Sequence, residues 1–270
     1  MRHPGFDPAR DWWIVAEGDD IVGAGMMWAV APLVQHSAFS VVRIDRRGLG
    51  LGAFMLGLCE RRAGELADES PAGEVLIRTH VDRLDPGGKA LVEAAGYVYV
   101  RSSYTMIGPL PTGITAPRPV PGSTIRTSSL DEGPLIHRLI EDTFSEHFGF
   151  RPVPYEEWAE GTLKRADADP DLWFIAEVDG EEAGLCLASV EGEQGWIADL
   201  GVRKEFRKRG IGEALLHHAF GALVEKGCTR VGLGVDAGNE TGAVALYEKV
   251  GLRNERTYDS FDKTFRARTS

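Results

Sequence analysis

The chain has 270 residues, of which 43% are hydrophobic and 26% are charged, and its formal net charge is −11. This composition is typical of an ordinary globular protein, long enough for one large domain or two of moderate size. The acidic balance argues against nucleic acid as a partner, because binding a phosphate backbone needs a basic surface. No apolar run approaches the ~20 residues of a membrane span, and residues 1–13 lack the apolar core of a signal peptide. We therefore expect a cytoplasmic protein without a membrane partner.

The cysteines Cys59, Cys186 and Cys228 lie in apolar or helical surroundings without CxxC spacing. In such surroundings buried, reduced thiols are expected rather than a disulfide or a zinc site. We therefore expect no bound metal.

Hydrophobic periodicity and turn residues predict the elements of the first half of the chain. A hairpin is expected from strands 12–17 and 21–30, followed by a helix at 53–66, a strand at 74–81, a helix at 87–95, and strands at 97–102 and 104–107. Proline, glycine and threonine then alternate over residues 109–121, which indicates an extended and fairly stiff linker.

The second half opens with a predicted strand at 124–128, and the same signals continue from there. Helices are expected at 130–148 and 154–165, strands at 171–178, 182–190 and 196–202, a helix after Gly212, a strand at 230–235, a helix at 242–250, and strands at 253–258 and 261–265.

The strand at 196–202 leads through a basic turn into Gly210, Ile211 and Gly212, and then into a helix. A helix start carries partnerless N–H groups and a partial positive charge, so glycines there let a phosphate approach the main chain. Cations are normally disfavoured at this place, yet here they gather, and an anion with several charges among them explains the arrangement. The cations are Arg203, Lys204, Arg207, Lys208 and Arg209. The alternative is a solvated basic turn at the surface.

This turn occurs twice in the chain. Arg47, Gly50 and Gly52 align with Arg207, Gly210 and Gly212 at one constant offset (207 − 47 = 160), which indicates a duplicated domain. A rival interpretation treats Gly48, Gly50 and Ala53 as a dinucleotide fingerprint. The next strand then needs an acidic residue at its end, but it ends in Thr79-His80-Val81.

Val202 followed by Arg207-x-x-Gly210-x-Gly212 resembles motif A of the GCN5-related N-acetyltransferases (GNAT). Residues 235–252, from the turn at Asn239 to the helix bearing Leu246-Tyr247, resemble motif B of the same family. Motif B departs from the family pattern at Leu252, where phenylalanine is usual, and by one extra residue around Thr241-Gly242.

The resemblance implies an α/β fold with a mixed sheet, in two tandem GNAT-like domains, of which the first lacks its opening strand and helices. We expect the first, degenerate domain at 1–110, a linker at 111–122 and the catalytic domain at 123–270. This architecture is similar to that of mycothiol synthase-like acetyltransferases. The implied cosubstrate is acetyl-CoA. The residues expected to bind it are Leu200, Gly201, Val202, Arg207, Lys208, Arg209, Gly210, Ile211, Gly212, Asn239 and Tyr247, with a possible second CoA site at Arg47, Gly48, Gly50 and Gly52.

The resemblance also implies catalytic roles. Tyr247 matches the tyrosine that donates a proton to the CoA sulfur, although a tyrosine at that helical spacing also suits a core. The strand before the glycine turn is distorted in the family so that an N–H near residues 200–202 points at the thioester carbonyl, and Gly201 suits such an irregularity. Asp199 and Glu193 are both candidates for the base that deprotonates the amine.

The resulting expectation is a transferase that moves an acetyl group directly from acetyl-CoA to a primary amine of a small molecule. Two alternatives stay open: a non-catalytic CoA- or amine-binding protein with the same fold, and an acetyltransferase of peptide N-termini. We expect a monomer or a homodimer whose only other partner is the small-molecule amine.

Overall fold

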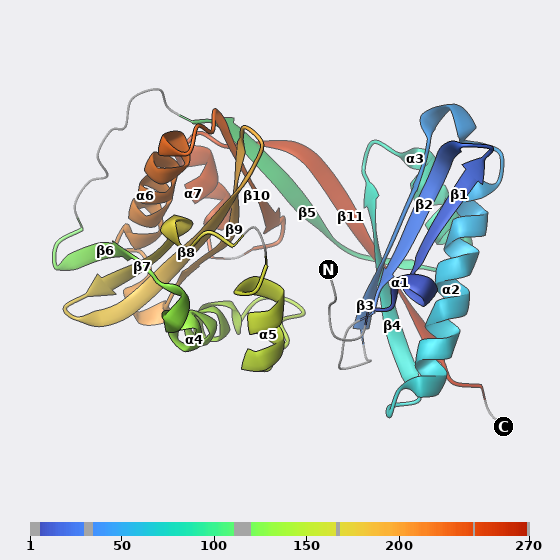
Figure 1. The fold of residues 1–270 in the computed structure, drawn as a ribbon, viewed down its shortest axis with the longest axis horizontal. Helices are drawn as coiled ribbons and strands as arrows, with labels where there is room; N and C mark the ends of the chain where they lie inside the picture. The colour runs from blue at the N-terminus through green and yellow to red at the C-terminus, as the bar shows by residue number, and fades with distance from the viewer. Residues whose placement is uncertain (1–5, 30–34, 111–119, 166–167, 240, 269–270) are drawn as a thin grey trace. The chain divides into compact units, whose positions relative to one another are not determined.

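The computed structural model describes residues 6–29, 35–110, 120–165, 168–239 and 241–268. The chain divides into two compact units, one formed by residues 1–103 with 256–270 and the other by residues 104–255. Each unit has strands in a mixed sheet and helices against it, which confirms the predicted α/β class (Figure 1). Most of the predicted linker, residues 111–119, lies outside the described residues.

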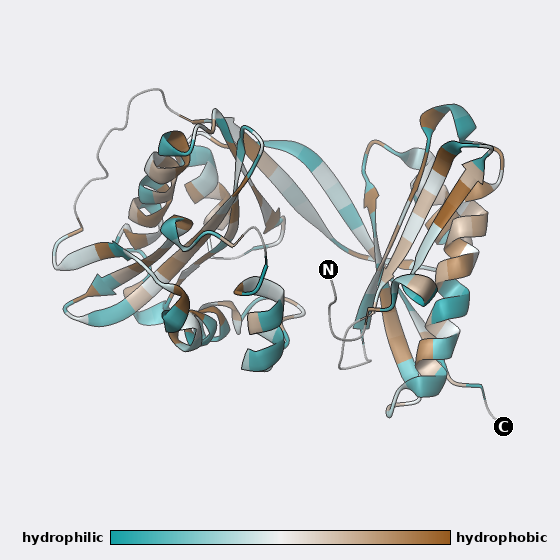
Figure 2. Cartoon of the chain, viewed as in Figure 1, coloured by the Kyte–Doolittle hydropathy of each residue, from teal (hydrophilic) through white to brown (hydrophobic). Residues whose placement is uncertain are grey.

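The first unit is a five-stranded sheet covered on one face by a long helix, in the strand order β1-β2-β3-β4-β11. Only β3 and β4 run parallel; the other neighbours are antiparallel. Its elements are α1 (Pro8–Asp11), β1 (Trp12–Glu17), β2 (Asp20–Trp28), β3 (Gln35–Val42), η1 (Ile44–Arg46), α2 (Leu51–Glu69), β4 (Glu74–Asp82), α3 (Pro86–Ala94) and β11 (Arg253–Arg266). Figure 2 shows the hydrophobic stretch of β1 in brown.

The second unit has the strand order β5-β10-β9-β8-β7-β6, with β9 and β10 parallel. Its elements are β5 (Val98–Pro109), β6 (Ser123–Thr127), η2 (Leu130–Glu132), α4 (Gly133–Phe144), α5 (Tyr155–Thr162), η3 (Pro170–Leu172), β7 (Trp173–Val178), β8 (Glu181–Glu191), β9 (Gln194–Val202), η4 (Lys204–Phe206), α6 (Ile211–Glu225), β10 (Arg230–Asp236) and α7 (Ala243–Lys249). The buried side chains of α6, among them Leu215, Leu216 and Ala219, fill the core of this unit with residues of β7–β10.

Two predicted strand breaks are absent, because β5 and β11 each run as one strand where two were expected. Polar side chains at these places have partners inside the first unit. Ser102 donates to Asp259 Oδ1 at 2.7 Å, and Arg83 donates to the same carboxylate. Hydrogen bonding satisfies the buried Ser102 and Asp259, so the backbone has no need to turn outward there.

The last strand returns to the first unit. Residues Tyr258–Arg266 of β11 pair antiparallel with Asp82–Glu74 of β4 along their whole length. As compact bodies, the units therefore differ from the predicted ranges 1–110 and 123–270 at the C-terminus. Where the duplicated domains end in evolutionary terms stays a prediction.

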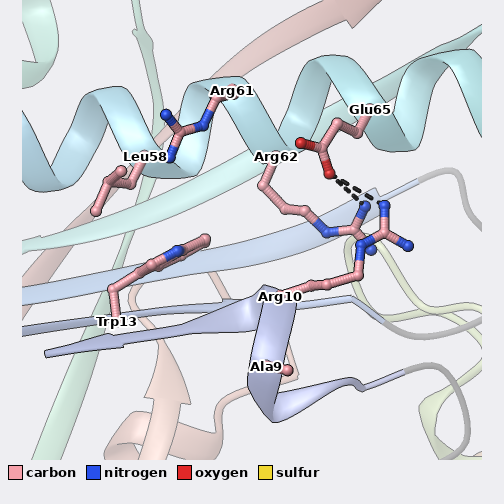
Figure 3. Close-up of a pocket in the computed structure, with 7 residues that line it drawn as sticks. All are labelled: Ala9, Arg10, Trp13, Leu58, Arg61, Arg62 and Glu65. Carbon is pink, nitrogen blue, oxygen red and sulfur yellow. Dashed lines mark hydrogen bonds and ion pairs between the residues drawn. The ribbon is translucent and has the colours of Figure 1, made fainter.

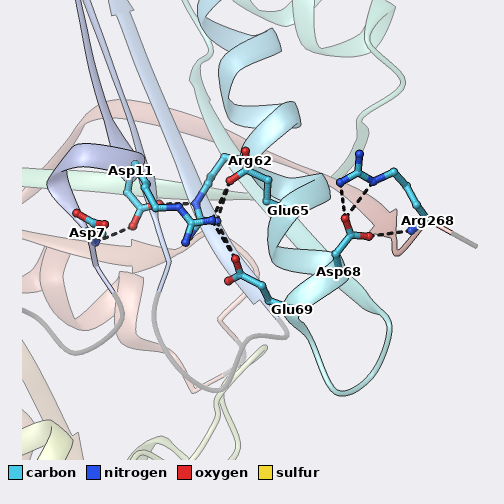
Figure 4. A network of polar contacts seen from close by, with 8 residues as sticks. Asp7, Asp11, Arg62, Glu65, Asp68, Glu69 and Arg268 are labelled. Atoms are coloured by element: carbon cyan, nitrogen blue, oxygen red, sulfur yellow. Dashed lines mark hydrogen bonds and ion pairs between the residues drawn. The ribbon is translucent and has the colours of Figure 1, made fainter. Parts of the chain in front are cut away.

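A buried ion pair fastens α2 to the start of β1. Arg62 Nε donates to Asp11 Oδ1 at 2.7 Å, and Asp11 is fully buried. Glu65 and Glu69 also pair with Arg62, as Figure 4 shows, and both carboxylates pair with Arg10 at the surface. Arg10, Arg61 and Arg62 also line a small hollow beside Trp13 (Figure 3). Removing one partner leaves the other charge buried without its ion-pair partner. Loss of either Asp11 or Arg62 would therefore lower the free energy of unfolding of this unit by about 3–5 kcal/mol.

His36 of β3 lies in the same core and is 2% exposed. Neither ring nitrogen has a hydrogen-bond partner among the described residues. Burial and the nearby Arg62 lower the pKa of His36 from 6.5 to about 4. The imidazole therefore stays neutral in the folded protein at pH values where it would be charged in the unfolded chain.

We predict an acid-sensitive loss of stability from His36. Because its folded pKa lies below the unfolded one, the unfolded state binds the proton first as the pH falls from 6.5 towards 4. The free energy of unfolding should then fall by about 2–3 kcal/mol through this group alone. Urea denaturation at pH 7 and pH 4.5 measures the loss, and His36→Phe should reduce it by that amount. An equal pH dependence in both proteins would contradict the prediction.

Candidate active site

The glycine turn before α6 leaves a set of main-chain donors exposed to a ligand. Gly210 is the N-cap of α6 in the left-handed region (φ 88°), and no side chain caps the helix. The first intrahelical bond runs from Ala214 N to Gly210 O at 3.0 Å. No described hydrogen bond uses the N–H groups of Ile211, Gly212 or Glu213. These amides and the positive end of the helix dipole suit the oxygens of an anionic group such as a phosphate.

Gly212 has a second reason to be glycine. A Cβ there would lie 3.3 Å from Leu246 Cδ2 on α7, so the small residue lets α7 pack against the start of α6. An ion pair between Lys249 and Glu213 joins the same two helices. The turn that offers the amides is thus also the contact that places the helix carrying Tyr247.

The cations of the turn fall into two groups. Arg207 Nε donates to Val202 O at 3.0 Å, and the guanidinium also contacts Glu146 at 2.8 Å. Lys204 binds the other oxygen of Glu146 at 2.7 Å. These two cations lower the pKa of Glu146 to about 2. Among the described residues no carboxylate pairs with Lys208 or Arg209, so both are available to an anion.

The ring of Phe206 packs against two arginines of the basic turn. It is 8% exposed, and the guanidinium carbons of Arg203 and Arg209 lie 5.9 and 5.8 Å from its ring centroid. Stacking on an aromatic face holds these cations near the turn at a gain of about 0.5–1 kcal/mol each.

The parallel strands β9 and β10 stop pairing inside the sheet. Their register runs from Gln194 opposite Arg230 to Ile197 opposite Leu233, although both strands continue further. At the same place β9 is bulged against β8, because Leu187 pairs with Asp199 and Ala188 with Ile197, which leaves Ala198 without an opposite residue. A bulge bends a strand and redirects its side chains. Beyond Ala198, the edge of β9 that faced β10 is free to pair with an extended ligand.

The irregularity was expected at Gly201, and that expectation is wrong. Gly201 pairs regularly with Leu185 of β8, whereas the bulge lies at Ala198. Gly201 is needed for packing instead: a Cβ there would lie 2.2 Å from Thr143 Oγ1 of α4. The glycine therefore seats the end of α4 on β9, close to the glycine turn.

Asp199 directly follows the bulge and is half-buried. Burial raises its pKa from 3.8 to about 6. Tyr247 of α7 is 7% exposed, and burial with the nearby Cys186 raises its pKa to about 12. Burial, and to a lesser degree Asp199, raises the pKa of the Cys186 thiol. Burial thus brings the titration of Asp199 close to neutral pH and keeps the Tyr247 phenol protonated.

The other expected site residues lie as follows. Leu200 and Val202 are on β9 after the bulge, opposite Cys186 and Gly184. Glu193 is exposed in the β8–β9 turn, about 30 Å along the strand from Val202 at a rise of ~3.3 Å per residue. Asp199, and not Glu193, lies where β9 and β10 cease to pair.

Asn239 and the extra residue of motif B form a local turn. Asn239 Oδ1 accepts from Thr241 N at 2.8 Å, so this oxygen is already committed. Gly242 is the N-cap of α7 with φ 83°, the same left-handed conformation that Gly210 has before α6. The insertion thus gives α7 a glycine start without moving Tyr247 off the helix.

The first unit repeats the backbone of this turn. Gly50 has φ 83°, Phe54 N bonds to Gly50 O at 3.0 Å, and a Cβ on Gly52 would lie 3.1 Å from Leu91 Cδ2. Gly52 therefore contacts Leu91 as Gly212 contacts Leu246, which agrees with the predicted duplication. Even the φ of 63° at Lys208 has its counterpart in Gly48, at 78°.

The chemistry differs between the repeats. The first turn has glycine and leucine where the second has Lys208 and Arg209, and its arginines are paired with carboxylates, including Arg47 with Asp85 at 3.4 Å. Strand β3 pairs with β2 without a register shift, and Val92 stands where the second unit has Tyr247. Of the two repeats, only the second joins free cations, a bulge and a proton donor.

Three features were not found from the sequence. Glu146 reaches the turn from about 60 residues away, and neither it nor Thr143 carries a local signal. The left-handed Lys208 could have been found, because it aligns with Gly48 at the offset of the repeat. The cysteines are free and buried, as expected. No cluster of metal-ligating side chains occurs in the part of the chain that the structure describes.

Comparison with known proteins agrees with this geometry. Residues 134–252 match the model of the acetyltransferase (GNAT) family. Acetyltransferases of Pectobacterium atrosepticum and Sodalis glossinidius are 36% and 34% identical over 87 residues, which is 32% of this chain and 61% of each relative. The chain thus aligns with less than two thirds of these relatives' length.

Solved structures extend the likeness to both units. A GCN5-related N-acetyltransferase from Sphaerobacter thermophilus is 28% identical with a TM-score of 0.85, covering 98% of this chain and 84% of that one. A tandem GNAT protein from the clavulanic acid pathway shares the fold at 16% identity and a TM-score of 0.71, covering 96% and 83%. The second unit thus contains a region that matches the acetyltransferase (GNAT) family model, and the two units together share the fold of these GNAT proteins.

We predict that Lys208 lowers the stability of the fold and strengthens the binding of an anion. Lys208→Gly should raise the free energy of unfolding by about 0.5–1 kcal/mol, because the left-handed conformation no longer strains a side chain. The lost cation should weaken CoA binding about three- to tenfold. Calorimetric titration and urea denaturation measure the two effects. Lys208→Met, which removes the charge and keeps the strain, should weaken binding without stabilising; equal stability of the two variants would refute the strain.

Proposed function

We propose that the second unit transfers an acetyl group directly from acetyl-CoA to a primary amine of a small molecule. The observation that carries the proposal is the coincidence, on one strand and the helices beside it, of an open amide turn, a bulge and a titratable carboxylate. The free N–H groups of Ile211–Glu213 with Lys208 and Arg209 fit the pyrophosphate of CoA. The edge of β9 beyond Ala198 fits the amide groups of the pantetheine arm.

The amine must lose a proton before it attacks the thioester carbon. Asp199, with a pKa of about 6, is ionised at neutral pH and basic enough to accept that proton directly or through water. The proton leaves the ammonium for the carboxylate, and the nitrogen lone pair then forms the new bond to the carbonyl carbon. The placement of Asp199 after the bulge favours it over Glu193 for this role.

The carbon–sulfur bond breaks as the amide forms, and the electron pair leaves with the CoA sulfur, while the nitrogen releases its second proton to solvent. Tyr247 supports this step as a proton donor, because a phenol with a pKa of about 12 holds its proton until a thiolate develops beside it. Val92 in the first unit has no proton to give. We therefore place catalysis in the second unit.

We predict that the pH profile of acetyl transfer reports Asp199. The value of kcat/KM should rise with pH through an apparent pKa of about 6, because only the ionised carboxylate accepts the proton. Asp199→Asn should reduce the rate about 10²-fold and remove this limb. Steady-state thiol release at pH 5–9 with a panel of primary amines tests both statements. A limb unchanged in Asp199→Asn would transfer the role to another group.

We predict that Tyr247→Phe lowers kcat about 10²-fold and leaves CoA affinity nearly unchanged, because the ring still packs and only the proton donor is lost. The control is Gly52→Glu in the first unit, which should keep the wild-type rate if that turn takes no part in catalysis. Thiol release and calorimetry measure the two quantities. A full rate in Tyr247→Phe beside a dead Gly52→Glu would place the chemistry in the first unit.

A further inference from the structure

Glu146 takes two cations away from the glycine turn. It lies two residues after the end of α4, in the segment 145–154 that leads to α5 and that we call the α4–α5 segment. Its two oxygens accept from Lys204 Nζ at 2.7 Å and Arg207 Nη1 at 2.8 Å. Two charge-assisted bonds to one anion are the pattern by which cations recognise a phosphate. Glu146 thus occupies the cations as a ligand phosphate would.

Arg207 does not need Glu146 to stay in place. Its Nε donates to Val202 O at 3.0 Å, which fixes the guanidinium at the end of β9. Removing the carboxylate therefore frees a cation that remains aimed at the turn. Because Glu146 is in direct contact with both cations, salt screens its charge little at that point, and the carboxylate opposes a phosphate that approaches them.

The α4–α5 segment is fixed where it leaves α4. Thr143 on the last turn of α4 is packed against Gly201 of β9, so the helix itself is held. Beyond it, main-chain bonds from His147 N to Phe144 O and from Phe150 N to His147 O form local turns, and the centroid of the His147 ring lies 4.7 Å from that of Phe144. Val153 is bound to α4, because its carbonyl contacts His137 Nε2 and its N–H donates to Glu141. Between these points, the ion pairs of Glu146 connect the segment to the glycine turn.

We propose that Glu146 is an internal latch that competes with the phosphates of CoA for Lys204 and Arg207, so that CoA binding releases the α4–α5 segment. The inference rests on the proposed function, because it takes the glycine turn as the CoA site. Release would follow binding of either CoA or acetyl-CoA, because both carry the same phosphates. By reciprocity, a ligand that draws the segment away from the turn raises CoA affinity by the same factor.

The test compares Glu146→Gln with wild type by calorimetry with CoA and by hydrogen exchange of residues 145–154. Loss of an exposed two-cation pair should raise CoA affinity about two- to fivefold. In wild type, saturating CoA should speed exchange at the amides of His147 and Phe150. In Glu146→Gln, that exchange should already be fast without CoA.

Glu205→Gln is the matched control. Glu205 pairs with Arg203 at 2.9 Å within the same turn, so the variant removes one negative charge without touching the segment. It should raise CoA affinity through charge alone and leave exchange at 145–154 unchanged. Weaker CoA binding by Glu146→Gln, or exchange in the segment that neither CoA nor the variant alters, would overturn the latch. Absence of CoA binding in every protein would instead refute the proposed function, while fast exchange in ligand-free Glu146→Gln would still support the contact.

Discussion

The parting of two parallel strands is the constraint on which the rest of the site depends. Parallel neighbouring strands normally satisfy each other's main-chain hydrogen-bonding groups along their length. The pairing of β9 and β10, however, ends at Ile197 and Leu233, although both strands continue. The bulge at Ala198 bends β9 at that point and leaves an open edge. Such an edge is costly to bury without a partner, so it suits an extended ligand that supplies the missing bonds. Asp199 is the residue after the bulge, so the bend that opens the edge of β9 also places Asp199 at that edge.

The two units show which parts of the turn serve the fold and which serve chemistry. Both keep the left-handed glycine and the close contact of a second glycine with a leucine, Gly52 with Leu91 and Gly212 with Leu246. These contacts are steric and hold the helix start on its sheet whatever is bound. Among the described residues, Lys208, Arg209, the bulge at Ala198 and Tyr247 occur together in the second unit, and the first unit has no counterpart of them. The backbone of the turn is therefore kept in both units although these side chains differ.

Buried polar groups give each unit a distinct electrostatic character. In the first unit, the Asp11–Arg62 pair sits beside a neutral His36 that has no described partner. In the second, burial acts on Asp199 and Tyr247 in the same direction, favouring their protonated forms. For the tyrosine this preserves a donor, and for the aspartate it brings titration close to neutral pH. Burial thus makes the first unit sensitive to acid through His36, and in the second unit it raises the pKa values of Asp199 and Tyr247.

The sequence by itself determined the glycine turn, the helix after it, the repeat at a constant offset and the position of Tyr247. Those features depend on residues a few positions apart, and their spacing and the positions that need glycine can be recognised in the sequence. Only the tertiary structure decided that the bulge lies at Ala198 rather than Gly201, that β11 returns along β4, and that Glu146 holds the turn's cations. Each of these depends on groups far apart in the chain: Thr143 against Gly201, β11 against β4, and a carboxylate about 60 residues from its cations. Local patterns carry no record of such contacts, because packing and charge select them only after the chain has folded.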